Sequence, residues 1–146
     1  MNAIQLDNLP LMEGWSEEDP TLRNRFAFPV SAQTGAAASA VVYFEVEPGH
    51  NCGRHLHSTE EVMVIVDGKA DVEIEGERRT IEAPGLVHVS AWTAHNVHGT
   101  GNSTLRVTSV FASAVFVTRF EQRLAPLDVD EVVVGASAGR QQPAMN

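Results

Sequence analysis

The sequence predicts an all-β fold, a sandwich or barrel that forms a single domain. Short segments repeatedly alternate apolar with polar residues, which is the period-two signature of half-buried strands. Gly and Pro residues separate these segments at regular spacing, which is typical of β-sandwiches and barrels. The 146 residues, 43% of them hydrophobic, suffice for one core. No internal repeat is evident, so we expect one barrel rather than two.

We expect residues 1–24 to form an N-terminal arm, because they are polar and interrupted by Pro and Gly. Trp15 within this arm has nothing nearby in sequence to bury against, so the arm should pack on a barrel, its own or a partner's. The first strand is predicted at residues 25–30. Pro29 lacks an amide hydrogen, which favours a place at the edge of a sheet.

The next strands are predicted from alternation and from turn residues. Residues 40–47 form a clear alternating strand, and residues 54–57 form a short one. Residues 62–66 are apolar on both faces, so this strand should be central, and Asp67-Gly68 after it is a strong hairpin signal. Further strands are expected, in chain order, at residues 69–75, 78–81, 87–89, 95–97 and 104–113.

Residues 115–120 are predicted as a strand or as an exchanged edge segment, which completes a barrel over residues 25–120. Residues 121–146 then form a C-terminal extension. Its last part, from Gly135 onward, is rich in Gly, Ala and Gln and has little to bury, so we expect the extension to be partly disordered.

Composition excludes several classes of partner. The formal net charge of −9 argues against nucleic acid, because nucleic-acid binding needs a basic surface, and it disfavours anionic membranes. No stretch approaches about eighteen consecutive apolar residues, and no signal peptide is visible. The single Cys52 forbids an internal disulfide and fits a reducing cytoplasm. A small, weakly charged molecule is the expected partner.

The most informative segment runs from Gly49 to Gly68. His55 and His57 are two residues apart, so in an extended strand their imidazoles face the same side. Glu61 follows a short turn and could return to the same point from the next strand. Two nitrogens and one oxygen that converge are the beginning of a transition-metal site. The other interpretation is a solvated segment whose histidines lie near each other by chance.

These five positions have the order and spacing of the first motif of the cupin superfamily, which the segment closely resembles. Residues 85–96 resemble the second cupin motif and place His95 at the position of a fourth ligand. This segment departs from the family pattern at Leu86 and Ser90, where an Asp and a Pro are usual, and Gly99, just after it, stands where the final Asn of the motif is usual. The resemblance implies a double-stranded β-helix, a jelly-roll barrel with the metal inside one mouth.

The resemblance also implies that His55, His57, Glu61 and His95 hold one divalent transition metal ion. Fe, Mn, Ni, Co, Cu and Zn all suit such ligands. Around an octahedral ion, two positions stay open for water, dioxygen or a substrate. A structural zinc site is usually closed and often rich in thiolates, so we prefer a catalytic or ligand-binding role. Glu61 is the most labile of the four ligands and is our candidate for a catalytic base.

The residues that line the mouth are predicted from the alternation around Glu61. If Glu61 points inward, Met63 and Ile65 do so too, and Phe44 belongs to the apolar face of its own strand. These three are candidates for substrate binding, with ordinary core packing as the alternative for each. An apolar bowl of this kind suits a small, weakly polar substrate such as an enol, a phenol or a short carbonyl compound.

Other residues near the motifs have more than one possible role. Trp92 precedes His95 and should pack over the mouth or in a dimer contact. His88 and His98 are candidates for the pocket, although regular alternation puts His98 on the face of its strand opposite His95. Cys52 is expected to be a small loop or core residue rather than a ligand.

Three functions stay open at this point. The first is a metal-dependent enzyme for a small organic molecule, because the resemblance to stand-alone cupins implies oxygenase, lyase, isomerase or cyclase chemistry. The second is a non-catalytic barrel that binds, senses or stores a small ligand. The third is sugar chemistry, although Lys69 is the only lysine of the chain and disfavours phosphosugars. The resemblance also implies a homodimer, with contacts expected near Trp15 and residues 112–117.

Overall fold

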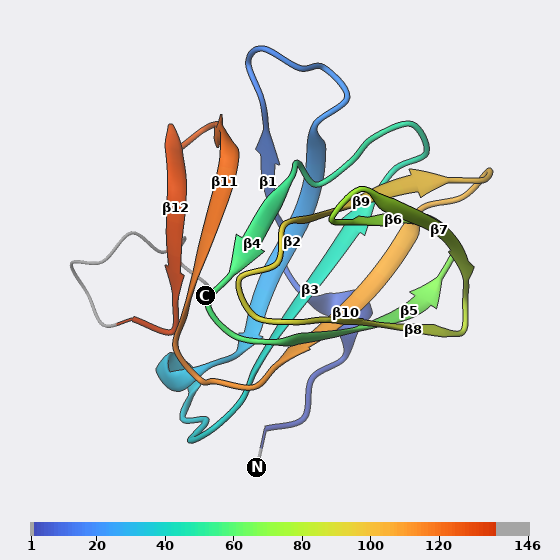
Figure 1. Ribbon diagram of the computed structural model, residues 1–146. Coiled ribbons are helices and arrows are strands. Elements are labelled where there is room, and N and C mark those ends of the chain that lie inside the picture. The colour runs from blue at the N-terminus through green and yellow to red at the C-terminus, as the bar shows by residue number, and fades with distance from the viewer. Residues whose placement is uncertain (1, 137–146) are drawn as a thin grey trace.

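The computed structural model describes residues 2–136 and confirms the expected all-β jelly roll, in which two antiparallel sheets pack face to face (Figure 1). Within these residues each sheet has six strands, in the order β1-β2-β3-β10-β5-β8 in the first sheet and β12-β11-β4-β9-β6-β7 in the second. The strands are β1 (Met12–Trp15), β2 (Arg23–Val30), β3 (Ala40–Val46), β4 (His55–His57), β5 (Glu61–Asp67), β6 (Lys69–Ile74), β7 (Glu77–Glu82), β8 (Gly85–Val89), β9 (His95–Thr100), β10 (Leu105–Phe111), β11 (Phe116–Leu124) and β12 (Val129–Val134). The described helices are two short 3-10 segments, η1 (Leu6–Asn8) and η2 (Ala32–Thr34).

The space between the sheets is filled mostly by apolar side chains, and β10 shows how the sequence places them. Leu105, Val107, Ser109 and Phe111 are buried on its inner face, whereas the residues between them point to the outer face. Burial of each large apolar side chain contributes about 1.5–3 kcal/mol. Apolar burial between the inner faces of the two sheets therefore supplies most of the stability of the fold. A polar residue on an inner face is an exception that needs an explanation.

Pro29 does not mark the edge of a sheet. β2 lies between β1 and β3, so the expectation of an edge strand is wrong. The register of β2 against β3 shifts between Ala27 and Val30, and Pro29 lies within this irregularity. Because a bulge interrupts the ladder, the missing amide hydrogen of proline costs no regular strand-to-strand bond there.

Segments on both sides of residues 25–120 contribute to the sheets. β1 pairs with β2, so the N-terminal arm packs on its own barrel. Trp15 also exchanges two backbone hydrogen bonds with Ala125, at N···O distances of 3.2 and 2.8 Å, in the loop between β11 and β12. This Trp15–Ala125 bridge links the edge strand of the first sheet to the terminal hairpin of the second. The tail from residue 137 onward, where disorder is expected, lies outside the described residues.

Residues 115–120 contribute to β11, as the expectation of a strand there requires. β11 pairs with β4 and with β12 of the same chain, so it is a regular strand of the second sheet. The position of β11 next to β4 matters for function, because β4 carries two of the candidate metal ligands.

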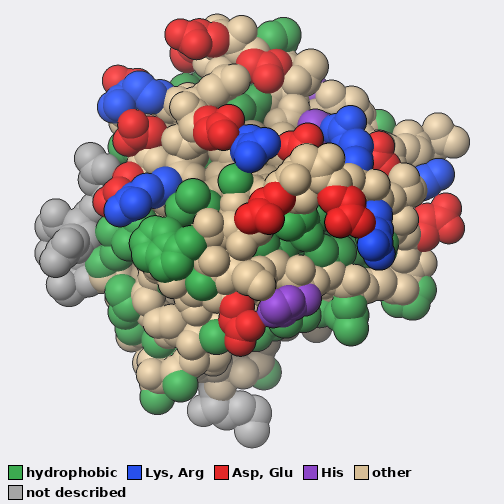
Figure 2. Space-filling model, in the orientation of Figure 1, with side chains coloured by type: hydrophobic (Ala, Val, Ile, Leu, Met, Phe, Trp, Pro, Cys, Tyr) green, Lys and Arg blue, Asp and Glu red, His purple; other side chains and the backbone are tan. Residues whose placement is uncertain are grey.

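Charged side chains of both signs cover the outer surface. Figure 2 shows Lys and Arg side chains beside Asp and Glu side chains on one face of the molecule. Arg25, for example, lies 3.0 Å from Glu45 and 2.9 Å from Glu47 on the outer face of the first sheet. Such half-buried ion pairs at the surface contribute about 0–1 kcal/mol each. Across residues 2–136, no helix combines the length and the apolar character that a membrane span needs.

Candidate metal centre

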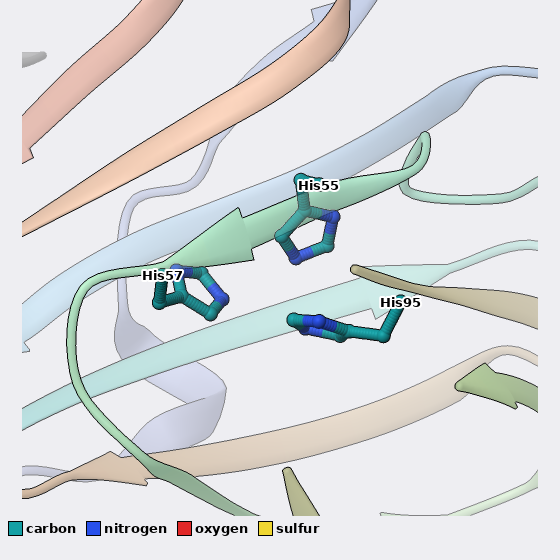
Figure 3. Close-up of side chains that lie close together, drawn as sticks. All are labelled: His55, His57 and His95. Atoms are coloured by element: carbon teal, nitrogen blue, oxygen red, sulfur yellow. The ribbon is translucent and has the colours of Figure 1, made fainter. Parts of the chain in front are cut away.

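Three imidazoles come together on the inner face of the second sheet (Figure 3). His55 and His57 are the first and last residues of β4, so the alternation of the strand turns both to the same face. His95 begins β9 and pairs directly with His55 across the two antiparallel strands. One ring nitrogen of each residue lies within 4.8 Å of the other two. The three nitrogens are therefore close enough to share one ion.

Glu61 reaches the same point from the opposite sheet. It is the first residue of β5, and its Oε1 atom lies 3.1 Å from His95 Nε2 and 3.3 Å from His57 Nε2. Only 3% of the residue is exposed. Buried charges persist in proteins when they are paired or when they bind a metal. Glu61 and the three imidazoles form one group that spans both sheets, and we call these four residues the histidine cluster. Glu61, His57 and His95 are buried, and His55 is half-buried.

The outer nitrogens of two imidazoles are fixed by backbone carbonyl groups. His55 Nδ1 lies 2.6 Å from the carbonyl oxygen of Gly53. His95 Nδ1 lies 2.8 Å from the carbonyl oxygen of Thr93. A carbonyl can only accept, so Nδ1 of each ring carries the hydrogen and donates it. The Nε2 atom of each ring then faces the cluster, where a metal ion would take its lone pair in place of the contact that His95 Nε2 makes with Glu61 in this structure.

The members of the cluster adjust each other's charge. Burial alone disfavours an ionised Glu61, but the electrostatic interactions and hydrogen bonds with His57 and His95 outweigh it and hold the pKa of Glu61 well below its usual range. Burial, and then the charges of His95 and His57, lower the pKa of His55 well below its ordinary value. A carboxylate and a neutral imidazole are the forms that bind metal. Three nitrogens and one oxygen suit a divalent ion of the first transition row.

The histidine cluster forms part of the wall of a cavity of about 110 Å³. All six phenylalanines of the chain line the same cavity. They are Phe26, Phe28, Phe44, Phe111, Phe116 and Phe120. Phe111 stacks on Phe116 with ring centroids 4.1 Å apart, and the ring of Phe120 lies 5.3 Å from that of His55. Such a lining suits apolar and aromatic molecules.

The charged groups of the lining are acidic or imidazole groups. Within the described part of the chain, the lining contains Glu13 and Glu61 but neither lysine nor arginine. Glu13 already pairs with Arg23 at 2.7 Å, and both side chains are exposed. Cys52 also lines the cavity, where burial raises its pKa to about 12 and keeps it a thiol at neutral pH. An anionic ligand would therefore meet no cationic Lys or Arg side chain here.

The predicted apolar substrate-binding residues separate into two groups. Met63 and Phe44 line the cavity. Ile65 is completely buried in the core, but it is not among the described residues that line the cavity. The alternation of β5 turns all of Glu61, Met63 and Ile65 inward, as expected. Ile65 lies two steps along the strand from Glu61, where core side chains fill the space.

The other three predicted pocket residues lie away from the described lining of the cavity, and the expectation for them is corrected. Trp92 is 52% exposed in the loop before β9. His88 lies on the outer face of β8, with Nε2 2.9 Å from a carboxylate oxygen of Glu60. His98 lies on the face of β9 opposite His95. The strand alternation turns both histidines away from the interior, and the loop leaves the indole in solvent.

Sequence reasoning missed the contribution of β11. Phe116, Thr118 and Phe120 alternate along this strand, and all three line the cavity. The hydroxyl of Thr118 lies 2.7 Å from His57 Nδ1, so it orients the third imidazole. The period-two pattern of these residues is the signal that could have found them. Phe116, part of the segment expected at a dimer contact, is only 2% exposed.

Comparisons with known proteins agree with this fold. Residues 42–111 match the family model described as Cupin domain, and a search of curated proteins found no match. A predicted oxalate decarboxylase from Thermotoga maritima is 18% identical with a TM-score of 0.63, and the alignment covers 76% of this chain and 98% of the other. The polyketide cyclase RemF from Streptomyces resistomycificus is 16% identical with a TM-score of 0.62, covering 76% and 78%. A cupin 2 domain-containing protein from Halorhodospira halophila is 27% identical with a TM-score of 0.56, covering 60% and 62%.

Proposed function

Because residues 42–111 match the Cupin domain model and the fold is that of cupin structures, we propose that this chain is a small, single-domain cupin and a metal-dependent enzyme for a small, weakly polar aromatic or enolic molecule. The observation that carries the proposal is the place of the histidine cluster in the wall of a cavity that is otherwise mostly apolar. A metal site that only stabilises a fold is usually closed by protein ligands and has no need of such a cavity.

His55, His57, His95 and Glu61 would hold one divalent transition metal ion, which can be Fe, Mn, Ni, Co, Cu or Zn. When bound, such an ion supplies Lewis acidity toward a carbonyl or hydroxyl oxygen or, if redox-active, activates dioxygen. The chain's own residues supply the remaining functions. The phenylalanines would bind and orient the substrate and exclude water, and Glu61, on leaving the metal, would accept a proton from the substrate.

The lining favours a neutral, ring-bearing substrate over a small anion. Oxalate, the substrate named for one structural neighbour, is a dianion, and the described lining offers no lysine or arginine to neutralise it. The activity named for another neighbour, cyclisation of a polyketide, is compatible with an apolar cavity. We therefore place this protein among metal-dependent lyases, cyclases or dioxygenases for weakly polar substrates.

The ligand assignment is tested by metal analysis of protein purified without chelator. We expect about one transition metal ion per chain in the wild type, because four donors of suitable type converge. His57→Ala removes one donor and should lose most of the metal. His88→Ala is the matched control, because His88 pairs with Glu60 outside the cavity. Full metal content in His57→Ala would show that the assignment is wrong.

The activity is tested with a panel of phenols, enols and 1,3-dicarbonyl compounds, in air and under argon, with products detected by mass spectrometry. Turnover that needs both metal and dioxygen indicates a dioxygenase. Metal-dependent turnover under argon indicates a lyase or cyclase. Stoichiometric binding of these compounds without any turnover would contradict the enzyme and favour the alternative, a non-catalytic ligand-binding or sensor protein.

We further propose that the protein is a cytoplasmic homodimer. Val66, Leu86 and Val110 are exposed on the outer face of the first sheet, on the neighbouring strands β5, β8 and β10. Val62 and Val64, on the same outer face of β5, connect these three side chains, and a contiguous apolar surface of this kind is typical of protein interfaces. The buried thiol of Cys52 fits a reducing compartment. Sedimentation velocity should show a dimer that Leu86→Glu converts to a monomer, and a monomeric wild type at all concentrations would contradict this.

A further inference from the structure

Ser109 is a polar residue in an apolar row. It lies on the inner face of β10 between Val107 and Phe111, is completely buried and lines the cavity. Its neighbours on the adjacent strands are Val42 and Met63, whose side chains offer a hydroxyl no strong hydrogen-bond partner. Within the described residues, the Oγ atom of Ser109 has no hydrogen-bond partner.

A buried hydroxyl without a partner destabilises the folded protein. Its transfer out of water costs free energy that no internal bond returns, and alanine would fill the same position without that cost. Asn24 Oδ1 is also unpartnered in the lining, but Asn24 is not fully buried. Ser109 therefore contributes a buried, unpartnered hydroxyl to the wall of a mostly apolar cavity, where a ligand can satisfy it.

We propose that Ser109 binds one oxygen of the substrate while a second oxygen of the same molecule lies at the histidine cluster. This inference rests on the proposed function and narrows its substrate class to aromatic or enolic molecules with two oxygen substituents. Hydroxyl and carbonyl oxygens both fit, because a serine hydroxyl can donate as well as accept.

The spacing along β10 supports this arrangement. Phe111 is the next inward residue after Ser109, pairs with Glu61 on β5, and has its ring 4.8 Å from that of His57. Two residues of a strand advance by about 6.6–6.8 Å, so Ser109 lies one such step from the level of the cluster.

The test measures the affinities of phenol, catechol, resorcinol and hydroquinone by calorimetry, for both zinc-loaded and metal-free protein. The variant is Ser109→Ala, which removes only the hydroxyl. Thr108→Val is the matched control. Thr108 is the next residue of β10, and its buried Oγ1 also lacks a partner in the described residues, but it faces away from the cavity.

We expect the wild type to bind at least one dihydroxybenzene about tenfold more tightly than phenol, which is the effect of one added hydrogen bond. Ser109→Ala should abolish this preference and leave the affinity for phenol unchanged. Thr108→Val should keep the preference. Both variants should melt at the same temperature as the wild type or higher, because each loses an unsatisfied hydroxyl.

If Ser109→Ala prefers dihydroxybenzenes over phenol as strongly as the wild type does, the proposal is overturned. The hydroxyl of Ser109 would then be bonded to a trapped water molecule rather than to substrate. The proposal would also be overturned if the wild type bound none of the four phenols. The measurements need no turnover, so a failure of catalysis does not affect them. If the protein binds no zinc, the metal assignment is wrong. The affinities of the phenols for metal-free protein still test the role of Ser109.

Discussion

Glu61 carries its charge where water does not reach it. A carboxyl group buried alone would keep its proton, because a low-dielectric surrounding disfavours the ionised form. His57 and His95 reverse this preference through contacts of 3.3 and 3.1 Å. The same residues that would bind a cation also stabilise the carboxylate without it, so the site is prepared for a positive charge before one arrives.

Thr118 is expected to act through His57. Thr118→Val keeps the shape of the side chain but removes the hydroxyl that lies 2.7 Å from His57 Nδ1. Loss of a partner that orients a ligand typically lowers metal affinity about 10–100-fold, and we expect this for zinc in competition with a chromophoric chelator. Thr118→Ser keeps the hydroxyl and should restore most of the affinity. An equal loss in both variants would instead indicate a packing effect.

Tyr43 allows a direct measurement of a shifted pKa, because it is the single tyrosine of the chain. Burial, reinforced by the hydrogen bond to Glu45, raises its pKa to about 12 despite the opposing bond from Arg106. The folded state thus holds the proton more tightly than the unfolded state, whose pKa is about 10. The resulting stability is complete below pH 10 and is lost as the pH rises toward 12.

Tyrosinate absorbance should therefore have a midpoint near pH 12 in the folded protein and near pH 10 in urea. Urea melts at pH 9 and pH 11 provide the linked measurement, with the lower unfolding free energy at pH 11. A folded-state midpoint near 10 would contradict the buried position of the hydroxyl.

The sequence predicts the direction of a side chain when that direction depends only on the strand to which the residue belongs. The spacing of His55 and His57 is enough to put both imidazoles on one face, because alternation is a property of a single strand. Ser109 and Thr118 show the limit. The role of each hydroxyl depends on the side chains that adjacent strands bring next to it. These are apolar side chains for Ser109 and an imidazole for Thr118. Nothing in the neighbouring sequence carries that information.

At the level of elements, the β5–β6 hairpin is fixed by Gly68. Its φ is +85°, and an added Cβ would lie 2.8 Å from the carbonyl oxygen of Thr104 and 3.0 Å from the Cα of Leu105. Gly76, in the next hairpin, has a φ of +84° but no atom within 4 Å of an added Cβ. The two positions share the same backbone conformation and differ in the space around it.

We expect Gly76→Ala to lower the unfolding free energy by about 1–2 kcal/mol, which is the cost of a left-handed backbone for a residue with a Cβ. Gly68→Ala should cost clearly more, roughly 3 kcal/mol or above, because backbone atoms block the new methyl group. Urea denaturation measures both. If both variants lose the same unfolding free energy, the close approach of Gly68 to Thr104 and Leu105 does not contribute to stability.

Strands with strong alternation were predictable, and strands defined by distant partners were not. Residues 40–47 and 62–66 correspond closely to β3 and β5. β1 has four residues, one of them glycine, and its sequence shows no period. It exists as a strand because β2 and Ala125 supply hydrogen-bond partners. The prediction of an edge strand from Pro29 was wrong for a related reason. The proline lies in an irregularity of the pairing with β3, which the sequence of β2 alone does not reveal.

At the level of the whole molecule, metal binding should stabilise the fold, because the ligands are brought together from both sheets. An ion at a free concentration 100-fold above its dissociation constant adds about 2.7 kcal/mol. We therefore expect zinc to raise the Tm of the wild type and of His88→Ala by several degrees. His57→Ala should show a much smaller rise in differential scanning fluorimetry. The same increase in His57→Ala would indicate zinc binding elsewhere.

The strand order β11-β4-β9 has a consequence for how the protein is made. β4 leaves the ribosome early with two of its imidazoles, but its partners follow much later, and Thr118 is 61 residues beyond His57. During synthesis these imidazoles lie on an unpaired strand beside exposed apolar residues, a situation typical of slow, non-local β topologies. The centre is complete only when β11 has emerged. Any metal that this centre binds would therefore be taken up in its complete form only after the chain has been synthesised through β11.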